Sequence, residues 1–557
     1  ACYVQFPTFL PQPVFINTIR SPLSQWESAY NYGISSKRGA NSTLKELKLR
    51  AEVLGTLTPE KVTFQQCIEW PLCFSRFLLK TAMTLHGAFT DCDQCKIRLH
   101  RFDSKKNNDS VETISQRITP SHDELFQEID RLIHQYLLVI PVELESVGLK
   151  MLEFAIPELF SENASREFHY RVVSSDSHHE SHYNSSIGNY YAERGGFNLL
   201  YRVALATFCD RAINSRVIGV NDHLVCENIM LTEPKKQYLM VKSLMFGGLN
   251  NQLLAFNAYL QLAIETNRTF VIPQFCAECP FVPRTESIVL EFDDIFELPT
   301  SSDHSMVSFN EIPPIHFLSS SETVNMTGPG WCNTEGPILL NSPRFKDETF
   351  IILELTNPRK QYISHHENFD FKLNSKMKRI TSEIIGSISG NAHQQDPLRQ
   401  DQNVVFLHLR IENDWHHHCS LKNAKPGCYV DLPELQKRFS SMDKELNHNR
   451  DVNQLLILAY ASDALLPNTP DLHIGWPAHF KVVTNEDIDK MFPSYLTFFE
   501  KSVVMKEIGL QAMMFIGHSL SSFSENIVQF RWSHGFNLSN TLYYDLNETS
   551  AAEATAG

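Results

Sequence analysis

Short apolar runs alternate with longer stretches of helical periodicity along this chain, and this alternation limits the fold more than any other feature. Val14–Ile19, Val404–Arg410 and Met513–Gly517 have the length and apolar content of buried strands. Between such runs, apolar residues recur at helical spacing, for example in 250–266. Strands that alternate with helices favour layers of helices around a parallel sheet. The sequence therefore predicts an α/β protein.

Length and charge narrow the possible classes further. The 557 residues suffice for about two to four domains, and a polar hinge at Glu233–Lys236 separates two predicted modules, 1–225 and 236–549. The net charge of −15 disfavours a nucleic-acid partner. Apolar runs of about 18 residues, as a membrane span requires, are absent from the sequence. We therefore expect a folded two-module protein with local cationic sites.

Cysteines and glycosylation sequons predict the compartment. The chain has twelve cysteines, with near pairs at Cys67/Cys73, Cys92/Cys95, Cys276/Cys279 and Cys419/Cys428, and eight N-x-S/T sequons. The two CxxC pairs are too far apart for a zinc ribbon, which favours disulfides over zinc. We expect a glycoprotein of the Golgi or ER lumen. Because the chain begins at Ala1, we expect an upstream anchor to be its only contact with a membrane.

In the first module, Arg20 follows the predicted strand Val14–Ile19, and Ser28 lies about two turns into the helix predicted to come next. A strand-end guanidinium and a helix hydroxyl at this spacing can bind one anion together. The alternative is a surface Arg and a solvated Ser.

Three segments of the first module resemble the galactose-3-O-sulfotransferase (galactosylceramide sulfotransferase) family. They are Phe15–Tyr32, Tyr136–Leu152 and Phe197–Phe208. The resemblance implies a P-loop-like domain that transfers sulfate from PAPS to a sugar, with Arg20 and Ser28 binding the 3′-phosphate. The family's 5′-phosphosulfate loop precedes this segment and has no counterpart here, so the predicted domain is N-terminally incomplete.

In the second module, a Gly-Gly turn, a strand-end Arg and a serine-rich helix start are the candidate phosphate-binding features. Gly247 and Gly248 join a predicted strand to the helix of 250–266, where the backbone can approach a diphosphate. Arg410 ends a strand, where ligands bind in open α/β sheets. Ser519–Ser524 begins another helix. Each feature also has a structural reading: a tight turn, an internal ion pair with Glu412 or Asp414, and an ordinary helix cap.

Taken in order, these segments resemble the motifs of the GDP-fucose protein O-fucosyltransferase superfamily. The motifs are Gly247–Gln252, His408–Asp414, and Phe515–Gly517 with Ser521–Ser524. The resemblance implies a GT-B fold of two Rossmann-like lobes and a GDP-fucose donor bound without metal. Two positions depart from the family: His518 replaces the usual Asn, and Asn485 stands where Asp is common.

The resemblance also implies residue roles. Arg410 would neutralise the leaving β-phosphate and Asn251 would contact the diphosphate or the sugar, so both are the predicted catalytic residues. The remaining predicted donor-binding residues are Gly247, Gly248, Asn250, Ser521, Ser522, Ser524 and Arg531.

Two His-rich segments, His178–His182 and His416–Cys419, do not have the ligand spacing of a known metal site and are predicted to be solvated loops. The resulting hypothesis is a lumenal transferase that joins a sulfotransferase-like domain to a fucosyltransferase-like domain. Its acceptor would be a glycolipid, a glycan or a glycoprotein. The alternatives are a non-catalytic glycan- or nucleotide-binding protein, and a protein in which only one domain is active.

Overall fold

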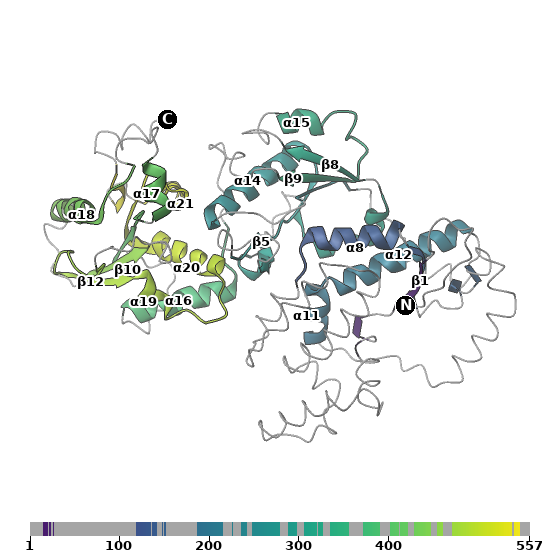
Figure 1. The fold of residues 1–557 in the computed structure, drawn as a ribbon, viewed down its shortest axis with the longest axis horizontal. Coiled ribbons are helices and arrows are strands. Elements are labelled where there is room, and N and C mark those ends of the chain that lie inside the picture. Colours follow the sequence, from purple (N-terminus) through teal and green to yellow (C-terminus); the bar gives the residue numbers. More distant parts are fainter. Residues whose placement is uncertain are drawn as a thin grey trace, which may run out of the picture.

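Two five-stranded parallel sheets form the framework of the computed structural model (Figure 1). We call the sheet within 238–355 with its helices the first lobe, and the sheet within 401–543 with its helices the second lobe. The described residues are 15–19, 22–23, 26, 119–134, 136–141, 147–148, 150–151, 186–215, 226, 236–241, 248–278, 288–297, 306–319, 321–326, 335–355, 371–389, 401–411, 413–420, 428–446, 454–459, 471–536 and 540–545. The predicted α/β class with parallel sheets is confirmed.

The second lobe has the strand order β12-β11-β10-β13-β14. Successive strands are added on one side of β10 and then on the other, so β10 and β13 flank the point where the chain order reverses. The predicted strands at 404–410 and 513–517 are confirmed, although β10 ends two residues before Arg410. The bounds are Asp401–His408 (β10), Gln454–Ala459 (β11), Phe480–Thr484 (β12), Ala512–Gly517 (β13) and Thr541–Tyr543 (β14).

Helices cover both faces of the second sheet, which explains its continuous apolar strands. On one face, Leu435 and Phe439 of α18 pack with Leu456 and Ile516 of the sheet. Helices α20 and α21 pack on the other face. The helices of this lobe are α16 (Ser375–Ser389), α17 (Asn413–Cys419), α18 (Leu432–Leu446), α19 (Asn485–Asp489), α20 (Phe498–Gln511) and α21 (Ser522–Ser533).

The first lobe has the strand order β7-β4-β3-β9-β8, and its chain order reverses between β3 and β9. Helix α14 (Leu249–Glu265) follows β3, as the sequence predicts. The strands are β3 (Tyr238–Val241), β4 (Thr269–Val271), β7 (Met306–Val307), β8 (Ser321–Met326) and β9 (Phe350–Leu355). Shorter elements complete the lobe: β5 (Phe275–Cys276), β6 (Val289–Leu290), η4 (Phe292–Asp294), η5 (Phe309–Glu311), η6 (Pro314–Leu318) and α15 (Glu335–Leu340).

Helices from the predicted first module cover one face of the first sheet. Leu199 and Val203 of α12 (Phe197–Ser215) are fully buried in one hydrophobic cluster with Tyr238 and Phe350 of the sheet. Leu125 of α8 (His122–His134) belongs to the same cluster. The strand predicted at Val14–Ile19 is confirmed as β1 (Phe15–Ile19), and it pairs in parallel with β2 (Tyr136–Pro141). Residues N-terminal to 225 therefore share a core with the sheet of 238–355.

Gln274 joins the start of α8 to the β5–β6 hairpin. Its Oε1 accepts from the backbone N–H of His122 at 2.8 Å, and its Nε2 donates to Glu291 Oε1 at 2.6 Å. Burial raises the pKa of Glu291 to about 7, although the charge of Arg194 on α11 (Ser186–Arg194) opposes this shift. Glu291 is thus a half-buried carboxyl group with a pKa raised to near neutral.

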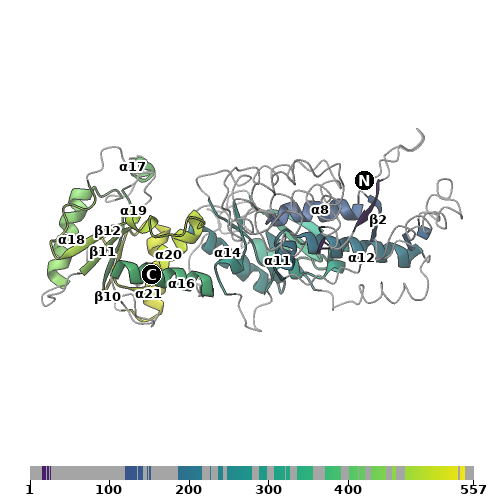
Figure 2. The same ribbon diagram turned by 90° about the horizontal axis from the view of Figure 1, so that it is seen from below.

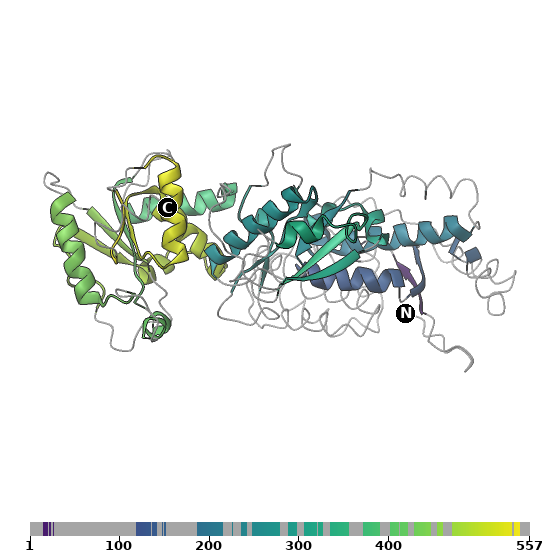
Figure 3. The same ribbon diagram turned by 90° about the horizontal axis from the view of Figure 1, so that it is seen from above.

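The two lobes meet through a shared core, at the junction of α14 with α20 (Figures 2 and 3). The rings of Phe275 in the first lobe and Phe499 in the second stack with centroids 4.9 Å apart. The backbone N–H of Phe499 donates to Ala277 O at 3.0 Å. Phe499 is 1% exposed, so this contact between the lobes belongs to the core.

Two disulfides lie within the described residues, Cys209–Cys226 and Cys419–Cys428. They favour an oxidising compartment, as the cysteine count predicts. Within the described ranges, no helix has the length and apolar content needed to span a bilayer. One loop prediction was wrong: His416–Cys419 lies in the helix α17, which also contains the buried Trp415. The second His-rich segment, His178–His182, lies outside the described residues.

Candidate functional site

The carboxyl ends of β10 and β13 bring most of the predicted second-lobe residues to one edge of the sheet. Leu407 and Ile516 are paired in register, so the segments after the two strands start side by side. Arg410 follows β10, and His518 follows β13. In doubly wound sheets this reversal of chain order is where ligands bind.

Ser524 connects this edge to α21. Its hydroxyl hydrogen-bonds with His408 Nδ1 at 2.8 Å and accepts from the backbone N–H of His518 at 3.0 Å. Gly517 is required for this approach, because a Cβ there would lie 2.5 Å from Ser524 Oγ. Ser524 is fully buried, and its predicted contact with a phosphate stays a prediction.

His408 and His518 are neutral parts of this edge. Burial is the main cause that lowers the pKa of each, and the charge of Arg410 lowers it further, while the Asp545 carboxylate opposes the shift at His518. His518 Nδ1 accepts from the backbone N–H of Leu520 at 3.1 Å, so its Nε2 carries the proton and donates to Cys428 O at 2.8 Å. His518, the departure from the family noted in the sequence, thus fixes the path of the loop after β13.

Arg410 lies half-buried at the same edge. Its guanidinium carbon is 4.2 Å from the ring centroid of Trp415, and its backbone N–H donates to Tyr544 Oη at 3.1 Å. Asp545, next in sequence, accepts hydrogen bonds from the backbone and the hydroxyl of Ser519. The segment after β14 therefore supports both the Arg410 backbone and the loop that leads into α21.

Helix α21 begins at this edge with backbone N–H groups suited to an anion. Ser521 is its N-cap residue, is 3% exposed and makes no side-chain capping bond; Ser522 is the first helical residue. The N-terminus of a helix carries partial positive charge, which adds to that of Arg410. The predicted helix start is confirmed, and phosphate binding by Ser521 and Ser522 stays a prediction.

The first lobe has a second helix start after its central strand. Gly248 is the N-cap residue of α14, and the space where its Cβ would point is open. Asn250 is 3% exposed, and among the described residues neither of its side-chain polar atoms has a hydrogen-bond partner. Buried carboxamides rarely stay unsatisfied, so a ligand at this helix start would explain Asn250. Asn251 is half-buried beside it.

Arg531 lies away from this group of residues. Its side chain is fully buried and donates to carbonyl groups that include Ala512 O at 2.6 Å, and to Thr541 Oγ1 at 2.9 Å. Ala512 is the first residue of β13, whereas the Arg410 edge is at the strand's other end. In this structure Arg531 therefore joins α21 to the amino end of the sheet.

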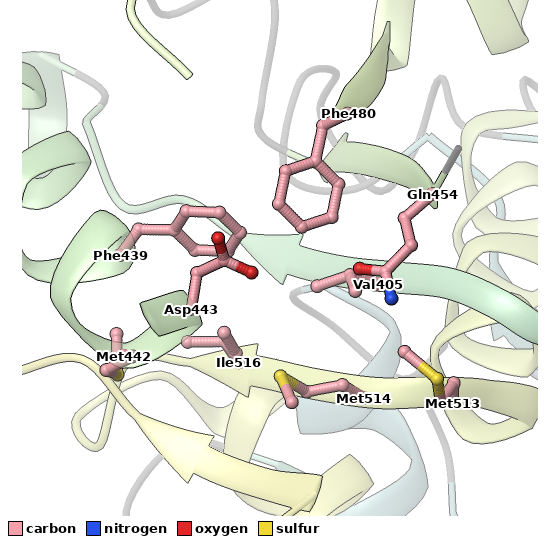
Figure 4. A pocket seen from close by; sticks show the side chains of 9 residues that line it. All are labelled: Val405, Phe439, Met442, Asp443, Gln454, Phe480, Met513, Met514 and Ile516. Atoms are coloured by element: carbon pink, nitrogen blue, oxygen red, sulfur yellow. The ribbon is translucent and has the colours of Figure 1, made fainter. Parts of the chain in front are cut away.

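A small cavity in the second lobe also lies away from the Arg410 edge. It lies between α18 and the sheet, and its polar groups are Asp443 and Gln454 (Figure 4). Gln454 and Phe480 are the first residues of their strands, so this part of the lining is at the amino ends. The lining residues are Val405, Phe439, Met442, Asp443, Gln454, Phe480, Met513, Met514 and Ile516.

Three predicted site residues, Arg20, Ser28 and Gly247, lie outside the described residues. Within the part of the chain that the structure describes, no group of three or more His, Cys, Asp and Glu side chains could hold a metal ion. Sequence reasoning missed Trp415 and Tyr544. A signal for Trp415 was available in the sequence, because Trp415 lies close to Arg410 and to the pair Cys419/Cys428 along the chain.

Comparison with known proteins gave matches among solved structures alone. No family model matches the chain, and no curated protein matches it. A crystal structure of POFUT1 in complex with GDP-fucose is similar over 56% of this chain and 98% of its own, at 15% identity and a TM-score of 0.38. NodZ alpha-1,6-fucosyltransferase soaked with GDP-fucose is similar over 53% of this chain and 92% of its own, at 11% identity and a TM-score of 0.29. An Arabidopsis thaliana FUT1 mutant in complex with GDP is similar over 66% of this chain and 81% of its own, at 10% identity and a TM-score of 0.30. The chain is thus distantly similar in structure to fucosyltransferases over about half of its length.

Proposed function

We propose that the chain is a glycosyltransferase of the GT-B type that binds GDP-fucose between its two lobes. The observation that carries the proposal is that Arg410 and the start of α21 share one reversal point of a parallel sheet. The unsatisfied Asn250 at the start of α14 supports it from the first lobe. A diphosphate suits these groups, because helix N-termini and a guanidinium all favour negative charge.

In the proposed reaction, an acceptor hydroxyl oxygen forms a bond to the fucose anomeric carbon and its proton is released to solvent, while the bond from that carbon to the β-phosphate oxygen breaks. GDP leaves with the bonding electron pair, so negative charge grows on the β-phosphate. Arg410 neutralises this charge, a role that metal ions have in other transferases. The acceptor is a hydroxyl of a glycolipid, a glycan or a glycoprotein.

Calorimetry and a GDP-release assay test this proposal. The full chain is expected to bind GDP-fucose more tightly than GDP-mannose. Arg410→Ala is expected to lower the transfer rate by about 10²-fold to 10³-fold, as loss of one donor to a transition-state charge does elsewhere. Arg379→Ala is the matched control, because Arg379 is exposed and pairs with Glu383 on α16. Unchanged turnover in Arg410→Ala would reject the role of Arg410, and no binding of either nucleotide would favour a non-catalytic protein.

A sulfotransferase-like activity of residues 1–225 is the second candidate. It rests on the resemblance of the sequence segments Phe15–Tyr32, Tyr136–Leu152 and Phe197–Phe208 to that family. The proposal is that Arg20 and Ser28 bind the 3′-phosphate of PAPS. Calorimetry with PAP tests it: binding that is lost in Arg20→Ala supports the site, and no binding by the full chain rejects it.

We infer a lumenal location in the Golgi or ER from the disulfides Cys209–Cys226 and Cys419–Cys428. Non-reducing peptide mapping of the protein secreted from cells tests this. Free thiols at these four cysteines would contradict the inference.

A further inference from the structure

Trp415 provides a flat aromatic surface for the Arg410 guanidinium. The guanidinium carbon lies 4.2 Å from the ring centroid, and Trp415 is 9% exposed. Contact between a cation and an aromatic face is worth about 0.5–2 kcal/mol, with the larger values at desolvated sites. In general, a guanidinium that stacks on an aromatic face keeps its N–H donors in its own plane, where they can donate to phosphate oxygens.

The indole itself is fixed by a backbone carbonyl. Trp415 Nε1 donates to Cys428 O at 3.0 Å, and His518 Nε2 donates to the same oxygen at 2.8 Å. The Trp415 and His518 rings meet edge to face with centroids 5.3 Å apart. A rotation of the indole would therefore break its hydrogen bond and its contact with His518.

A disulfide fixes the carbonyl in turn. Cys428 is bonded to Cys419, the last residue of α17, and Trp415 lies one helical turn earlier in the same helix. The donor and the acceptor of the indole hydrogen bond are thus covalently joined through a short closed segment, which limits how far they can separate.

From these contacts we propose that Trp415 is a positioning residue for Arg410, held by the carbonyl of the disulfide-bonded Cys428. Resting on the proposed function, the inference adds the reason why Arg410 has one defined orientation toward the diphosphate. An arginine side chain has many rotamers, and ordering it on a fixed surface before binding reduces the entropy lost when GDP binds.

A double-mutant cycle on GDP affinity tests the inference, with the Kd measured by calorimetry on the full chain. Trp415→Leu is expected to weaken GDP binding about tenfold, and Trp415→Phe, which keeps an aromatic face but loses the N–H, about threefold. Trp415→Leu is expected to have no further effect in an Arg410→Ala background, because its effect passes through Arg410. Trp476→Leu is the control: Trp476 also donates to a backbone carbonyl of this lobe, Leu472 O, and packs on Phe439.

The outcomes separate the two proposals. If the unmodified chain binds no GDP, the proposed function fails and the inference fails with it. If the chain binds GDP and Arg410→Ala weakens this binding, an unchanged Kd in Trp415→Leu overturns the inference about Trp415 but not the proposed function. An equal loss with and without Arg410 also overturns it, because Trp415 would then act on the fold. Should Trp415→Leu not fold, the same cycle with Trp415→Phe decides.

Discussion

A fragment cut to the predicted second module, 236–549, lacks residues 1–225, and this loss is expected to unfold the first lobe. Helices α8 and α12 lie in that segment and share a hydrophobic cluster with one face of the first sheet. Without them, the sheet would present apolar side chains to water. These side chains, each at most 5% exposed in the intact chain, are Tyr238, Met240, Val271, Phe350 and Ile352.

The size of the effect follows from this burial. Exposing one such side chain costs about 1.5–3 kcal/mol. Phe309 and Phe317 cover part of the same face, so we count about half of the area, which gives a loss of about 4–8 kcal/mol. A whole domain is stable by only about 5–15 kcal/mol. The fragment 236–549 should therefore lack a cooperative thermal transition, bind a dye specific for exposed apolar surface and aggregate.

Point variants of the full chain test the same reasoning without truncation. Leu199→Ala, on α12, is expected to lower the free energy of unfolding by about 2–5 kcal/mol. Ile338→Ala, at a side chain that is 78% exposed, should change it by less than about 0.5 kcal/mol. A monomeric 236–549 fragment that unfolds cooperatively within about 5 °C of the full chain would refute the reasoning.

Two further predictions concern buried charges. Arg531→Met should destabilise the second lobe by about 3–5 kcal/mol in urea unfolding, because it leaves buried carbonyl groups without donors. Arg379→Met, on the exposed face of α16, is the control and should have little effect. Equal effects of the two substitutions would contradict the structure. Glu291→Gln should stabilise the chain at pH 8 by up to about 3 kcal/mol and have little effect at pH 5. The folded pKa of Glu291, about 7, is raised above its ordinary value of 4.5, so the cost of its carboxylate grows as the pH rises from about 4.5 to about 7 and is fully present above 7. A gain of equal size at both pH values would show that its charge is not the cause.

The local part of the fold could be predicted from the sequence, because burial on both faces makes a parallel strand a continuous apolar run. Strands β10 and β13 and helix α14 follow the predicted ranges within a few residues. The start of α21 was predicted as well, since serines before an apolar helix are a recognisable cap signal.

Packing between distant segments could not be predicted in this way. The contact of α12 with the first sheet depends on which apolar face meets which, and a helix that is apolar on most sides gives little indication of its partner. Arg531 shows the same limit among the predicted site residues. Its sequence position near the serine motif suggested a phosphate ligand, but α21 is long enough to place it at the opposite edge of the sheet.

The stacked rings of Phe275 and Phe499 have a consequence for motion between the lobes. Domains joined by polar, solvated contacts usually swing about a hinge, whereas an apolar junction that is continuous with both cores resists rotation. The angle between the two sheets is then set when the chain folds, before any nucleotide arrives. A hinged enzyme loses conformational entropy when it closes on its ligand, whereas this chain would already have lost that entropy on folding. Small substitutions at the contact of Phe275 with Phe499 would then change the affinity for the proposed nucleotide, although neither residue is a candidate ligand.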